Sequence, residues 1–505
     1  MKEIKRALIS VYYKDGLAEI AKILADNGVE ILSTGGTYDF LQENAIKVTA
    51  VETVTGYPSI LGGRVKTLHP KIFGGILCRR ENEQDRAETI RYEIPPVDLV
   101  IVDLYPFEEY VAADASHDQI IEKIDIGGIS LIRGAAKNYR DVVIIPSKES
   151  YAPFLSILKE RGCKTTLEER EYFAAHAFMV SSHYDTAIFS YFNRKFGIPA
   201  FKESFHHART LRYGENPHQK GIYYGTADSL PAQLHGKEIS YNNLLDIEAA
   251  VELISDFTET TVAILKHNNA CGCASAPTLK EAWEKALEAD PVSAYGGIIA
   301  TNKEVDRDTA LEMNKIFFEV IVAPSYSPEA LEILKSKKNR IILESGNIRP
   351  SRNKFRSMFG GALVQERDAY TETLQDLKPA TEKQPLPEEM EDLLFANKLV
   401  KHSKSNAIVL ARGKQMLASG IGQTSRVDAL KQAIQKAKSF NFDLNGAVIS
   451  SDAFFPFADC VEIAAAEGIR TVIQPGGSVR DNDSIAYCNA NGIAMVMTGI
   501  RHFKH

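Results

Sequence analysis

The chain has 505 residues, of which 44% are hydrophobic and 25% are charged, and its formal net charge is −7. The length predicts two or three domains, the composition excludes a disordered or fibrous protein, and the charge argues against nucleic acid or an anionic membrane as a partner. Six scattered cysteines form no regular framework, and no apolar stretch approaches the roughly 18–20 residues that span a bilayer. We therefore expect a soluble cytoplasmic protein with reduced thiols.

The first part of the chain alternates short apolar runs with helical patterns. Residues 7–11 and 29–33 predict strands, and apolar residues at helical spacing between them predict a helix. Further strands are expected at 97–104 and 142–145, and a helix at 151–159. This alternation is typical of a largely parallel sheet covered by helices, in which ligands bind at the carboxyl ends of the strands.

Two motifs of this part are suited to an anion. The sequence Thr-Gly-Gly-Thr at 34–37 follows a predicted strand and opens a helix, which favours a phosphate site or a plain capped glycine turn about equally. Lys66 and Thr67 lie in a predicted loop, Gly-Arg-Val-Lys-Thr-Leu-His-Pro at 63–70, which is either a solvated basic loop or an anion-binding segment. Neither motif is a Walker A or a dinucleotide fingerprint.

Three more side chains are candidates for chemistry in the same sheet. Tyr105 ends a strongly apolar strand, while Asp125 in Ile-Asp-Ile-Gly-Gly and Lys137 in Ala-Ala-Lys-Asn are expected at other strand–loop junctions. Each has a structural alternative, such as an aromatic anchor for Tyr105. Together with Lys66, they would provide acid–base chemistry and oxyanion stabilisation at one sheet edge.

The periodicity is lost at residues 193–209, and we place the end of a first domain, 1–198, in this segment. The rest resumes the α/β alternation, and a polar, proline-containing break divides it into subdomains of about 199–370 and 385–505. Both subdomains run strand, polar motif, helix, which indicates a duplication.

A lysine and a histidine follow the apolar strand 261–265. Lys266 and His267 emerge at its carboxyl end, and Cys271 and Cys273 come just after. One interpretation is a metal site of His267 with the two cysteines, and the other is metal-free acid–base catalysis by His267 beside Lys266. Zinc deaminases use H-x-E and P-C-x-x-C, which this segment does not match, so zinc is disfavoured.

Two segments near the end complete the motifs. Three phenylalanines follow Ser-Ser-Asp at 450–457, where they either fill a core or form an aromatic wall for a flat heterocycle. The predicted strand 493–498 precedes the basic run 501–505, and we expect it to hold Arg501 where its guanidinium can bind a phosphate.

Taken together, these strings resemble the bifunctional enzymes that are both AICAR (aminoimidazole-carboxamide ribonucleotide) formyltransferase and IMP (inosine monophosphate) cyclohydrolase. The similarity runs from Leu-Ile-Ser-Val at residues 8–11 to the Arg-His-Phe-Lys-His of 501–505. It implies an α/β fold with an N-terminal methylglyoxal-synthase-like parallel-sheet domain that closes the ring of formyl-AICAR to give IMP. It further implies two cytidine-deaminase-like α/β subdomains that transfer a formyl group from 10-formyltetrahydrofolate to AICAR, no zinc, a possible monovalent cation, and a homodimer with shared formyl-transfer sites.

The resemblance also assigns site residues. For ring closure it implies the catalytic residues Lys66, Tyr105, Asp125 and Lys137. The implied nucleotide contacts of that site are Lys14, Thr34, Gly35, Gly36, Thr37, Arg64, Thr67, Asp103, Ile126 and Gly127. For formyl transfer it implies catalytic roles for Lys266, His267 and Asn406. The implied AICAR, folate or phosphate contacts are Arg212, Tyr213, Asn243, Gly296, Glu319, Arg426, Phe454, Asp459, Ser478 and Arg501.

Three departures from the family pattern stand beside proposed site residues. The chain has Tyr12-Tyr13 where the family typically has Ser-Asp before lysine, Asp103 where it has asparagine, and Asn269-Ala270 where a proline commonly follows Lys-His. None removes a proposed catalytic group. Two other classes remain as alternatives: a zinc-dependent nucleotide deaminase, and a nucleotide-sensing regulator without catalysis.

Overall fold

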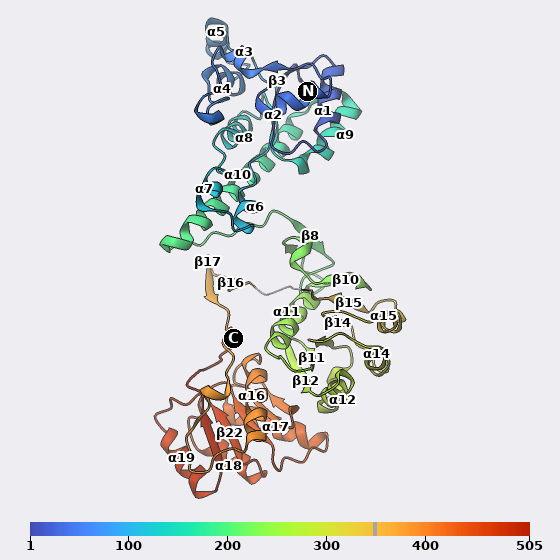
Figure 1. The fold of residues 1–505 in the computed structure, drawn as a ribbon, viewed down its shortest axis with the longest axis vertical. Coiled ribbons are helices and arrows are strands. Elements are labelled where there is room, and N and C mark those ends of the chain that lie inside the picture. The colour runs from blue at the N-terminus through green and yellow to red at the C-terminus, as the bar shows by residue number, and fades with distance from the viewer. Residues whose placement is uncertain (347–350) are drawn as a thin grey trace. The chain divides into compact units, whose positions relative to one another are not determined.

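The computed structural model describes residues 1–346 and 351–505, which divide into two units, Met1–His207 and Ala208–His505 (Figure 1). The division falls nine residues after the predicted end of the first domain at residue 198, because the segment after the last helix of the first unit still packs on that unit. His183 of that helix, for example, hydrogen-bonds Ser204 at 3.0 Å. Each unit is described by itself.

The first unit is built on a five-stranded sheet in the order β4-β3-β2-β5-β6, in which every neighbouring pair is parallel. This confirms the strands and the parallel sheet predicted from the apolar runs. Since β5 and β6 are buried along their whole length, helices cover both faces. The strands are β2 (Arg6–Ser10), β3 (Glu30–Ser33), β4 (Thr49–Ala50), β5 (Leu99–Val102) and β6 (Val143–Ile145), with a separate pair β1 (Lys2–Glu3) and β7 (Lys164–Thr165).

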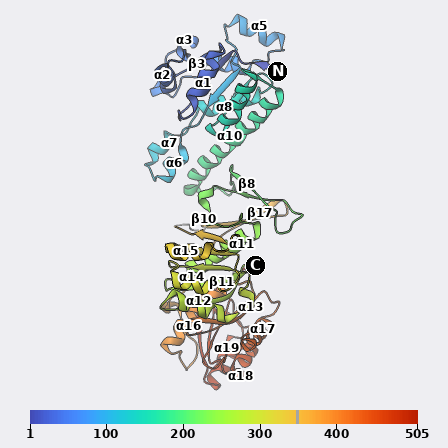
Figure 2. The same cartoon turned by 90° about the vertical axis from the view of Figure 1, so that its right-hand side faces the viewer.

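The helices of this unit include the predicted ones after β2, β3 and β6. The longest, α10, has 30 residues and begins with a capping box between Thr166 and Glu169 (Figure 2). They are α1 (Leu17–Asp26), α2 (Gly35–Glu43), α3 (Val51–Thr55), α4 (Pro70–Leu77), α5 (Glu83–Arg91), α6 (Phe107–Ala112), α7 (His117–Ile121), α8 (Gly127–Lys137), α9 (Tyr151–Arg161) and α10 (Leu167–Phe196).

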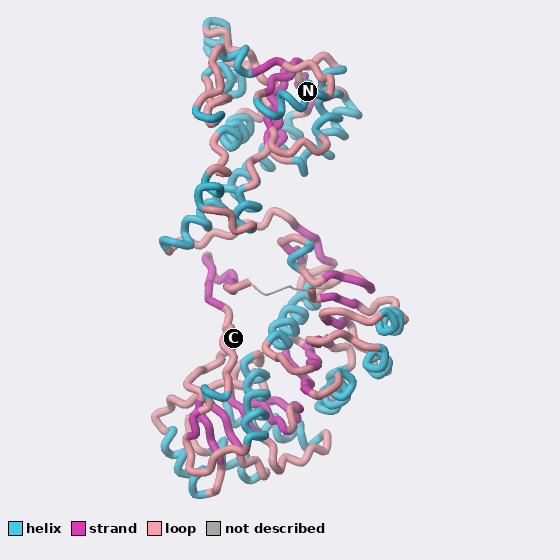
Figure 3. The backbone as a smooth tube through the Cα atoms, in the orientation of Figure 1, coloured by secondary structure: helices cyan, strands magenta, loops and turns pink. Residues whose placement is uncertain are grey.

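The second unit contains a twelve-stranded mixed sheet in the order β10-β15-β14-β13-β11-β12-β20-β19-β21-β22-β23-β18. Its strands are β10 (Ala232–His235), β11 (Thr261–Lys266), β12 (Asn269–Ser275), β13 (Ile298–Thr301), β14 (Val320–Ala323), β15 (Ile341–Glu344), β18 (Lys378–Pro379), β19 (Ile408–Arg412), β20 (Gln415–Gly420), β21 (Val448–Ser451), β22 (Thr471–Gln474) and β23 (Ala494–Met497). Two smaller sheets are β8 (Ala208–Leu211) with β9 (Gly221–Tyr224), and β16 (Asn353–Met358) with β17 (Gly361–Glu366), a separate hairpin in Figure 3.

The twelve strands form two halves with the same plan. The first half contains β10 to β15 and the second half β18 to β23, and they meet at β12 and β20. From this centre outward, each half has a two-stranded hairpin, three strands parallel to one another, and one short strand at the edge. The halves join where β12 pairs antiparallel with β20. This topology confirms the duplication that the sequence indicated.

Apart from the short α13, which has no counterpart among the described residues of the second half, the helices repeat in the same order in the two halves. Proline starts α13, α15 and α16, where its missing N–H costs no hydrogen bond. The first half has α11 (Tyr241–Ser255), α12 (Leu279–Ala289), α13 (Pro291–Ala294), α14 (Arg307–Met313) and α15 (Pro328–Lys335), and the second has α16 (Pro387–Lys401), α17 (Arg426–Ser439), α18 (Asp459–Ala466) and α19 (Asp481–Ala490).

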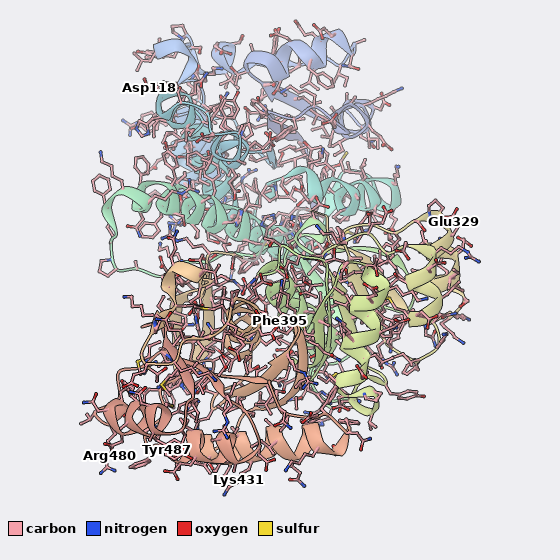
Figure 4. All side chains as sticks on the ribbon, turned by 60° about the horizontal axis from the view of Figure 1, so that its bottom comes forward. Asp118, Glu329, Phe395, Lys431, Arg480 and Tyr487 are labelled. Carbon is pink, nitrogen blue, oxygen red and sulfur yellow. The ribbon has the colours of Figure 1, made fainter. Side chains whose placement is uncertain are left out.

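The core of the second unit runs through both halves. Phe395 of α16 lies in the interior, 5.6 Å between ring centroids from Phe257, whereas Lys431 of α17 lies on the outside (Figure 4). One buried cluster combines β11, β13 and β14 with α16, β19 and β21. The two halves therefore share one core. Among the described residues, no helix has the length and apolar character needed to cross a membrane.

Candidate active sites

The first unit gathers polar residues at the carboxyl edge of its parallel sheet. β2 and β3 end side by side, so the segments after them, with Lys14 and residues 34–37, meet at this edge. Thr37 joins the two segments: its Oγ1 accepts from Val11 N at 3.0 Å and donates to Val11 O at 2.9 Å. Lys14 Nζ donates to Thr37 Oγ1 at 3.2 Å, and burial lowers the pKa of this lysine.

Lys66 and Thr67 lie at the N-termini of two helices. A Cβ at Gly35, the first residue of α2, would lie 3.0 Å from Lys66 Nζ, and one at Gly127, the first residue of α8, would lie 3.5 Å from Thr67 Oγ1. The free N–H groups at the start of a helix carry partial positive charge, which the Lys66 ammonium reinforces. The arrangement suits an anion such as a phosphate.

Asp103 follows β5 and is buried against the segment after β2. One of its carboxylate oxygens accepts from Tyr13 N at 2.9 Å, and the other accepts from Tyr12 N. A carboxylate provides two such acceptors, whereas asparagine provides one. Burial raises the pKa of Asp103, while the two N–H groups and Lys14 oppose the rise. Asp103 therefore fixes the backbone of the segment after β2.

Asp125 is fixed at the start of α8. Its Oδ1 accepts from Gly128 N at 2.5 Å, and its own N–H donates to the Tyr184 hydroxyl of α10 at 2.9 Å. A Cβ at Gly128 would lie 2.8 Å from Asp125 Oδ2, so a larger residue there would displace this carboxylate. Burial raises the pKa of Asp125. The pKa of Tyr105 is raised mainly by its own burial and, second, by the negative charge of Asp125. Tyr105 and Asp125 are thus neighbours at the anion site.

Lys137 lies at the other end of the helix that Asp125 precedes. The prediction that Asp125 and Lys137 lie at strand–loop junctions is wrong, because Asp125 lies between α7 and α8, just before α8, and Lys137 is the last residue of α8. Ten residues of helix at 1.5 Å per residue separate Gly127 and Lys137 by about 15 Å. Val142 N donates to Asn138 O, and the chain then enters β6, so Lys137 precedes the amino end of that strand. Lys137 is exposed, and its backbone lies toward the amino end of β6.

The remaining predicted contacts of the first unit lie around the anion site or at its surface. Thr34 is buried, and its hydroxyl donates to Glu52 Oε1 at 2.8 Å. Arg64 is exposed and forms an ion pair with Glu122. Ile126 is the exposed residue that precedes α8. Gly36 and Gly127 are in the first turns of their helices, where their N–H groups are free.

In the second unit, Lys266 ends β11 and His267 begins the two-residue turn to β12. Lys266 pairs with Asn269 across the hairpin, and φ is 53° at His267 and 65° at Asn268. Positive φ at both turn residues is the pattern of a type I′ turn, and for a residue such as His267 it costs about 1 kcal/mol. Asp246 of α11 supports the turn, because its Oδ1 accepts from Asn268 N at 2.7 Å. The hairpin holds the exposed His267 in one place.

Predicted substrate contacts surround this turn. Lys266 Nζ donates to Tyr295 O at 2.9 Å, and Gly296, with φ of 74°, gives the backbone conformation that the next turn requires. Asn243 Nδ2 donates to Glu319 Oε2 at 3.4 Å, and Glu319 also forms an ion pair with Lys237. These residues come from β11, α11 and the segments before β13 and β14.

The two cysteines after the turn do not assemble the alternative metal site. A β-bulge in the hairpin between Ile264 and Leu265 places Cys271 on the same side as α12, while Cys273 packs in the core on the other side. Cys271 Sγ donates to Ile264 O, and burial raises its pKa to about 12. Thiols on opposite faces of a sheet cannot bind one ion together with His267, and no metal-binding cluster of His, Cys, Asp and Glu occurs in the part of the chain that the structure describes.

The second half presents a buried charged cluster around Asn406. Arg426, the first residue of α17, donates to Asn406 Oδ1 at 2.8 Å and to Ser451 Oγ at 3.0 Å, and it pairs with the buried Asp452. Asp452 also accepts from Ala407 N at 3.1 Å. Arg426 thus orients Asn406, and both of its amino groups already have protein partners.

The other predicted contacts of the second unit are more exposed. Arg212 lies over the ring of Tyr213 at 5.4 Å, in a loop that Asn242 joins to α11 through a bond to Glu215 O at 3.1 Å. Phe454 is 36% exposed two residues after Asp452. Asp459 is the first residue of α18, and Ser478 Oγ accepts from Arg480 N at 3.1 Å.

The segment 501–505 is anchored by its even-numbered residues. His502 is buried, and its ring bonds Asp368 and, at 2.8 Å, Glu372, while its backbone N–H donates to Asp452 O at 3.0 Å. Lys504 N donates to Ser405 Oγ at 3.1 Å, next to Asn406. Arg501 remains exposed, 4.2 Å from the ring of Phe503. The expectation that β23 holds this segment in a fixed place agrees with these bonds.

The residues of the two halves lie along one edge of the large sheet. Because β12 and β20 are antiparallel, the turn of the first half and the start of β19 in the second half are on the same side. Lys404 N accordingly donates to Asn269 Oδ1 at 3.4 Å. Asp452, Ser478 and Arg501 follow the carboxyl ends of β21, β22 and β23 at that edge.

Sequence reasoning missed two carboxylates of this edge, Asp246 and Asp452. Asp452 stands in the Ser-Ser-Asp motif that drew attention only for its phenylalanines. Asp246 lies in the middle of a helix, where nothing local marks it. Its signal is the duplication, because Asp246 and Asp392 occupy the same position, the sixth, of the equivalent helices α11 and α16.

Two α/β units, each with its own group of polar residues at a sheet edge, are the arrangement expected of an enzyme with two active sites. Family models agree with this division: one for the AICARFT/IMPCHase bienzyme matches residues 135–436, and one for an MGS-like domain matches residues 16–130. The bifunctional purine biosynthesis protein PurH of Bacteroides thetaiotaomicron is 64% identical over 504 residues, which cover 100% of this chain and 99% of that protein. Proteins of the same name from Persephonella marina and Acetivibrio thermocellus are each 48% identical over 99% of this chain and 100% of their own.

The chain belongs to the AICARFT/IMPCHase bienzyme family. As a member of it, the protein is a bifunctional enzyme of purine biosynthesis that catalyses the last two steps of IMP synthesis, formyl transfer to AICAR and ring closure.

Proposed function

We propose that residues 1–207 close the ring of formyl-AICAR and that residues 208–505 transfer the formyl group from 10-formyltetrahydrofolate to AICAR. The observation that carries this division is that each group of polar residues is drawn from one unit of the chain. The anion site with Asp125 and Tyr105 belongs to the first, and the Lys266-His267 turn with Asn406 belongs to the second.

For ring closure, the starts of α2 and α8 bind the substrate phosphate and formyl oxygen, with Lys66 as the cation between them. The reaction joins two groups of one molecule, so holding them in contact supplies much of the rate. Lys66 stabilises the negative charge that develops on the formyl oxygen, and Asp125 and Tyr105 move the proton of the attacking amide. We leave Lys137 out of this site because of its distance from Gly127.

For formyl transfer, His267 is the base that removes the proton as the weakly nucleophilic amine of AICAR attacks. Lys266 stabilises the tetrahedral intermediate, and Asn406, oriented by Arg426, supplies a hydrogen bond at the same edge. Phe454 provides an aromatic surface for the pterin ring, and the exposed guanidiniums of Arg212 and Arg501 bind the substrate phosphate. This mechanism uses no zinc. Metal analysis of the purified protein tests this point and also tests whether a monovalent cation binds.

We also propose a homodimer, located in the cytoplasm. The β16–β17 hairpin supports the dimer: its loop residue Phe359 is fully exposed, and Leu363 and Val364 of β17 are about half exposed. Apolar side chains at the end of a two-stranded hairpin are typical of a surface that a partner covers, and a second copy of this chain is the partner we assign.

One assay tests both activities. The full chain is supplied with AICAR and 10-formyltetrahydrofolate, and the release of tetrahydrofolate and the formation of IMP are followed separately. Residues 1–207 alone, supplied with formyl-AICAR, should form IMP. A folded fragment without this activity would contradict the assignment of ring closure to the first unit.

Two lysines of the first unit provide a sharper test. Lys66→Ala should lower the rate of ring closure by about 10²–10⁴-fold, the usual effect of losing a proton-transfer or charge-stabilising group, and leave formyl transfer unchanged. Lys137→Ala, at the far end of α8, should change ring closure less than about threefold. The reverse order of effects would mean that Lys137 reaches the substrate.

A further inference from the structure

The duplication of the second unit offers an internal control for one side chain beside the formyl-transfer turn. Lys266-His267-Asn268-Asn269 in the first half and Arg412-Gly413-Lys414-Gln415 in the second half are equivalent hairpins. The two central residues have positive φ in both, 53° and 65° in the first and 58° and 53° in the second. Each hairpin has its register shift at the same distance before the turn.

Each turn is also held by an aspartate from the equivalent helix. In the second half, Asp392 of α16 uses both oxygens: Oδ2 accepts from Gly413 N and Oδ1 from Lys414 N, each at 2.7 Å. In the first half, Asp246 of α11 uses one, since Oδ1 accepts from Asn268 N at 2.7 Å. Among the described residues, nothing donates to Asp246 Oδ2. The carboxylate at this position therefore fixes the turn in both halves. In the first half, only one of its two oxygens does so.

The residue that replaces Gly413 in the first half is His267. Asp246 lies near enough for the charge of His267 to lower its pKa, against the rise that burial produces, and Glu319 is the other charged group acting on it. Lys266 ends the adjacent strand, but its ammonium points to Tyr295 O at 2.9 Å. Lys237 is paired with Glu319 at 3.1 Å. The free Oδ2 of Asp246 thus belongs to the carboxylate that holds the turn in which His267 lies.

We propose that Asp246 is a positioning residue for formyl transfer, whose second oxygen accepts the N–H of His267 and turns the other ring nitrogen toward the substrate amine. The inference rests on the proposed role of His267 as the base. A hydrogen bond to one ring nitrogen fixes the tautomer and makes the other nitrogen the acceptor. A carboxylate partner also stabilises the imidazolium that forms when the base takes up its proton.

The isosteric changes Asp246→Asn and Asp392→Asn separate this role from support of the turn. In Asp246→Asn, the new amide keeps an oxygen for Asn268 N and places a donor beside the imidazole, so the turn survives and the tautomer is disfavoured. In Asp392→Asn, the new amide must place its NH₂ against Gly413 N or Lys414 N, so one of the two hydrogen bonds that Asp392 accepts is lost.

We expect Asp246→Asn to lower kcat of formyl transfer at least tenfold, with the KM for AICAR changed less than threefold, and to move the acid limb of the pH–rate profile to lower pH. Asp392→Asn should lower the melting temperature and leave that profile in place.

A direct readout does not depend on turnover. With ¹⁵N-labelled histidine in the full-length protein, the ring shifts of His267, assigned by their loss in His267→Gln, should report one dominant tautomer in the wild type and a mixture in Asp246→Asn. Unchanged shifts and an unchanged pH–rate profile in Asp246→Asn would overturn the proposal. If the tautomer changes while wild-type formyl transfer does not depend on His267, Asp246 orients the imidazole, but the proposed base is wrong and the role of Asp246 in formyl transfer falls with it.

Discussion

The two halves of the second unit have the same order of strands, an equivalent hairpin and, apart from the short α13, equivalent helices, but they place functional side chains at different points. In the first half, Lys266 and His267 occupy the hairpin turn itself. In the second half, the equivalent turn holds Gly413 and Lys414, and Lys414 forms ion pairs with Glu259 at 2.7 Å and Glu391 at 2.6 Å. The functional cluster of that half, Asn406 with its neighbours, lies at the opposite end of its strands.

This difference follows from how the halves are joined. The antiparallel pairing of β12 with β20 turns the second half around, so that one edge of the sheet receives the turn of the first half and the strand starts of the second. The residues of the formyl-transfer edge therefore come from the hairpin turn of one half and from the opposite end of the strands in the other half. The comparison predicts that equivalent substitutions in the two halves have unequal effects.

The largest effect is expected at the turns. His267→Asn keeps a residue that tolerates positive φ and removes the proposed base, so formyl transfer should fall by about 10²–10⁴-fold while ring closure is unchanged. Gly413→Asn is the matched control, because φ there is 58° and an added Cβ meets nothing within 4 Å. Both rates are measured for each variant. Equal loss of formyl transfer in the two variants would mean that the turns act only as structure.

A smaller effect on stability is expected at the start of α17. Arg426 and Asp452 correspond to Leu279 and Asn302 of the first half, where Asn302 Oδ1 accepts from Thr261 N at 3.0 Å as Asp452 does from Ala407 N. Arg426→Leu leaves Asp452 buried without its cation, which typically costs about 3–5 kcal/mol of unfolding free energy. Adding Asp452→Asn should recover most of that stability in denaturant melts but not formyl transfer. Recovery of the activity as well would show that Arg426 does not orient a catalytic group.

The smallest effect, and the one that depends on pH, is expected at His502. Burial alone would lower the pKa of His502, but the bonds and charges of Asp368 and Glu372 raise it to about 9. A folded pKa above the unfolded value means that the stabilisation is complete below about pH 6.5 and is lost as pH rises through about 9, by at most about 3 kcal/mol. The melting temperature of His502→Gln should therefore fall less between pH 6.5 and 9.5 than that of the wild type. His505→Gln, at an exposed position, should show the same fall as the wild type. A wild-type melting temperature constant over this range would contradict the charged state of His502.

The sequence predicted those parts of the fold and site that have a local signal. Apolar runs located the strands, and Lys266-His267 was found because both residues come directly after such a run. Asp246 and Asp452 act through contacts with segments 22 and 45 residues away in sequence, which no local pattern reveals.

Lys137 was misplaced for a different reason. It belongs to a helix whose buried residues Leu131, Ile132, Ala135 and Ala136 have helical spacing. That spacing is visible in the sequence and shows that Lys137 and Asp125 are at opposite ends of one rod. The two motifs look close in sequence, but the helix between them separates their backbones.

The anchoring of His502 and Lys504 has a consequence for the order in which the two sites can form during synthesis. Everything that the first unit needs has left the ribosome once residue 207 has emerged, so ring-closure geometry can be reached early. The second unit must wait, because Asp368, Glu372, Ser405 and Asp452 all take partners from residues 502–504. A nascent chain that stalls between these two points would carry a finished ring-closing unit and an open formyl-transfer edge.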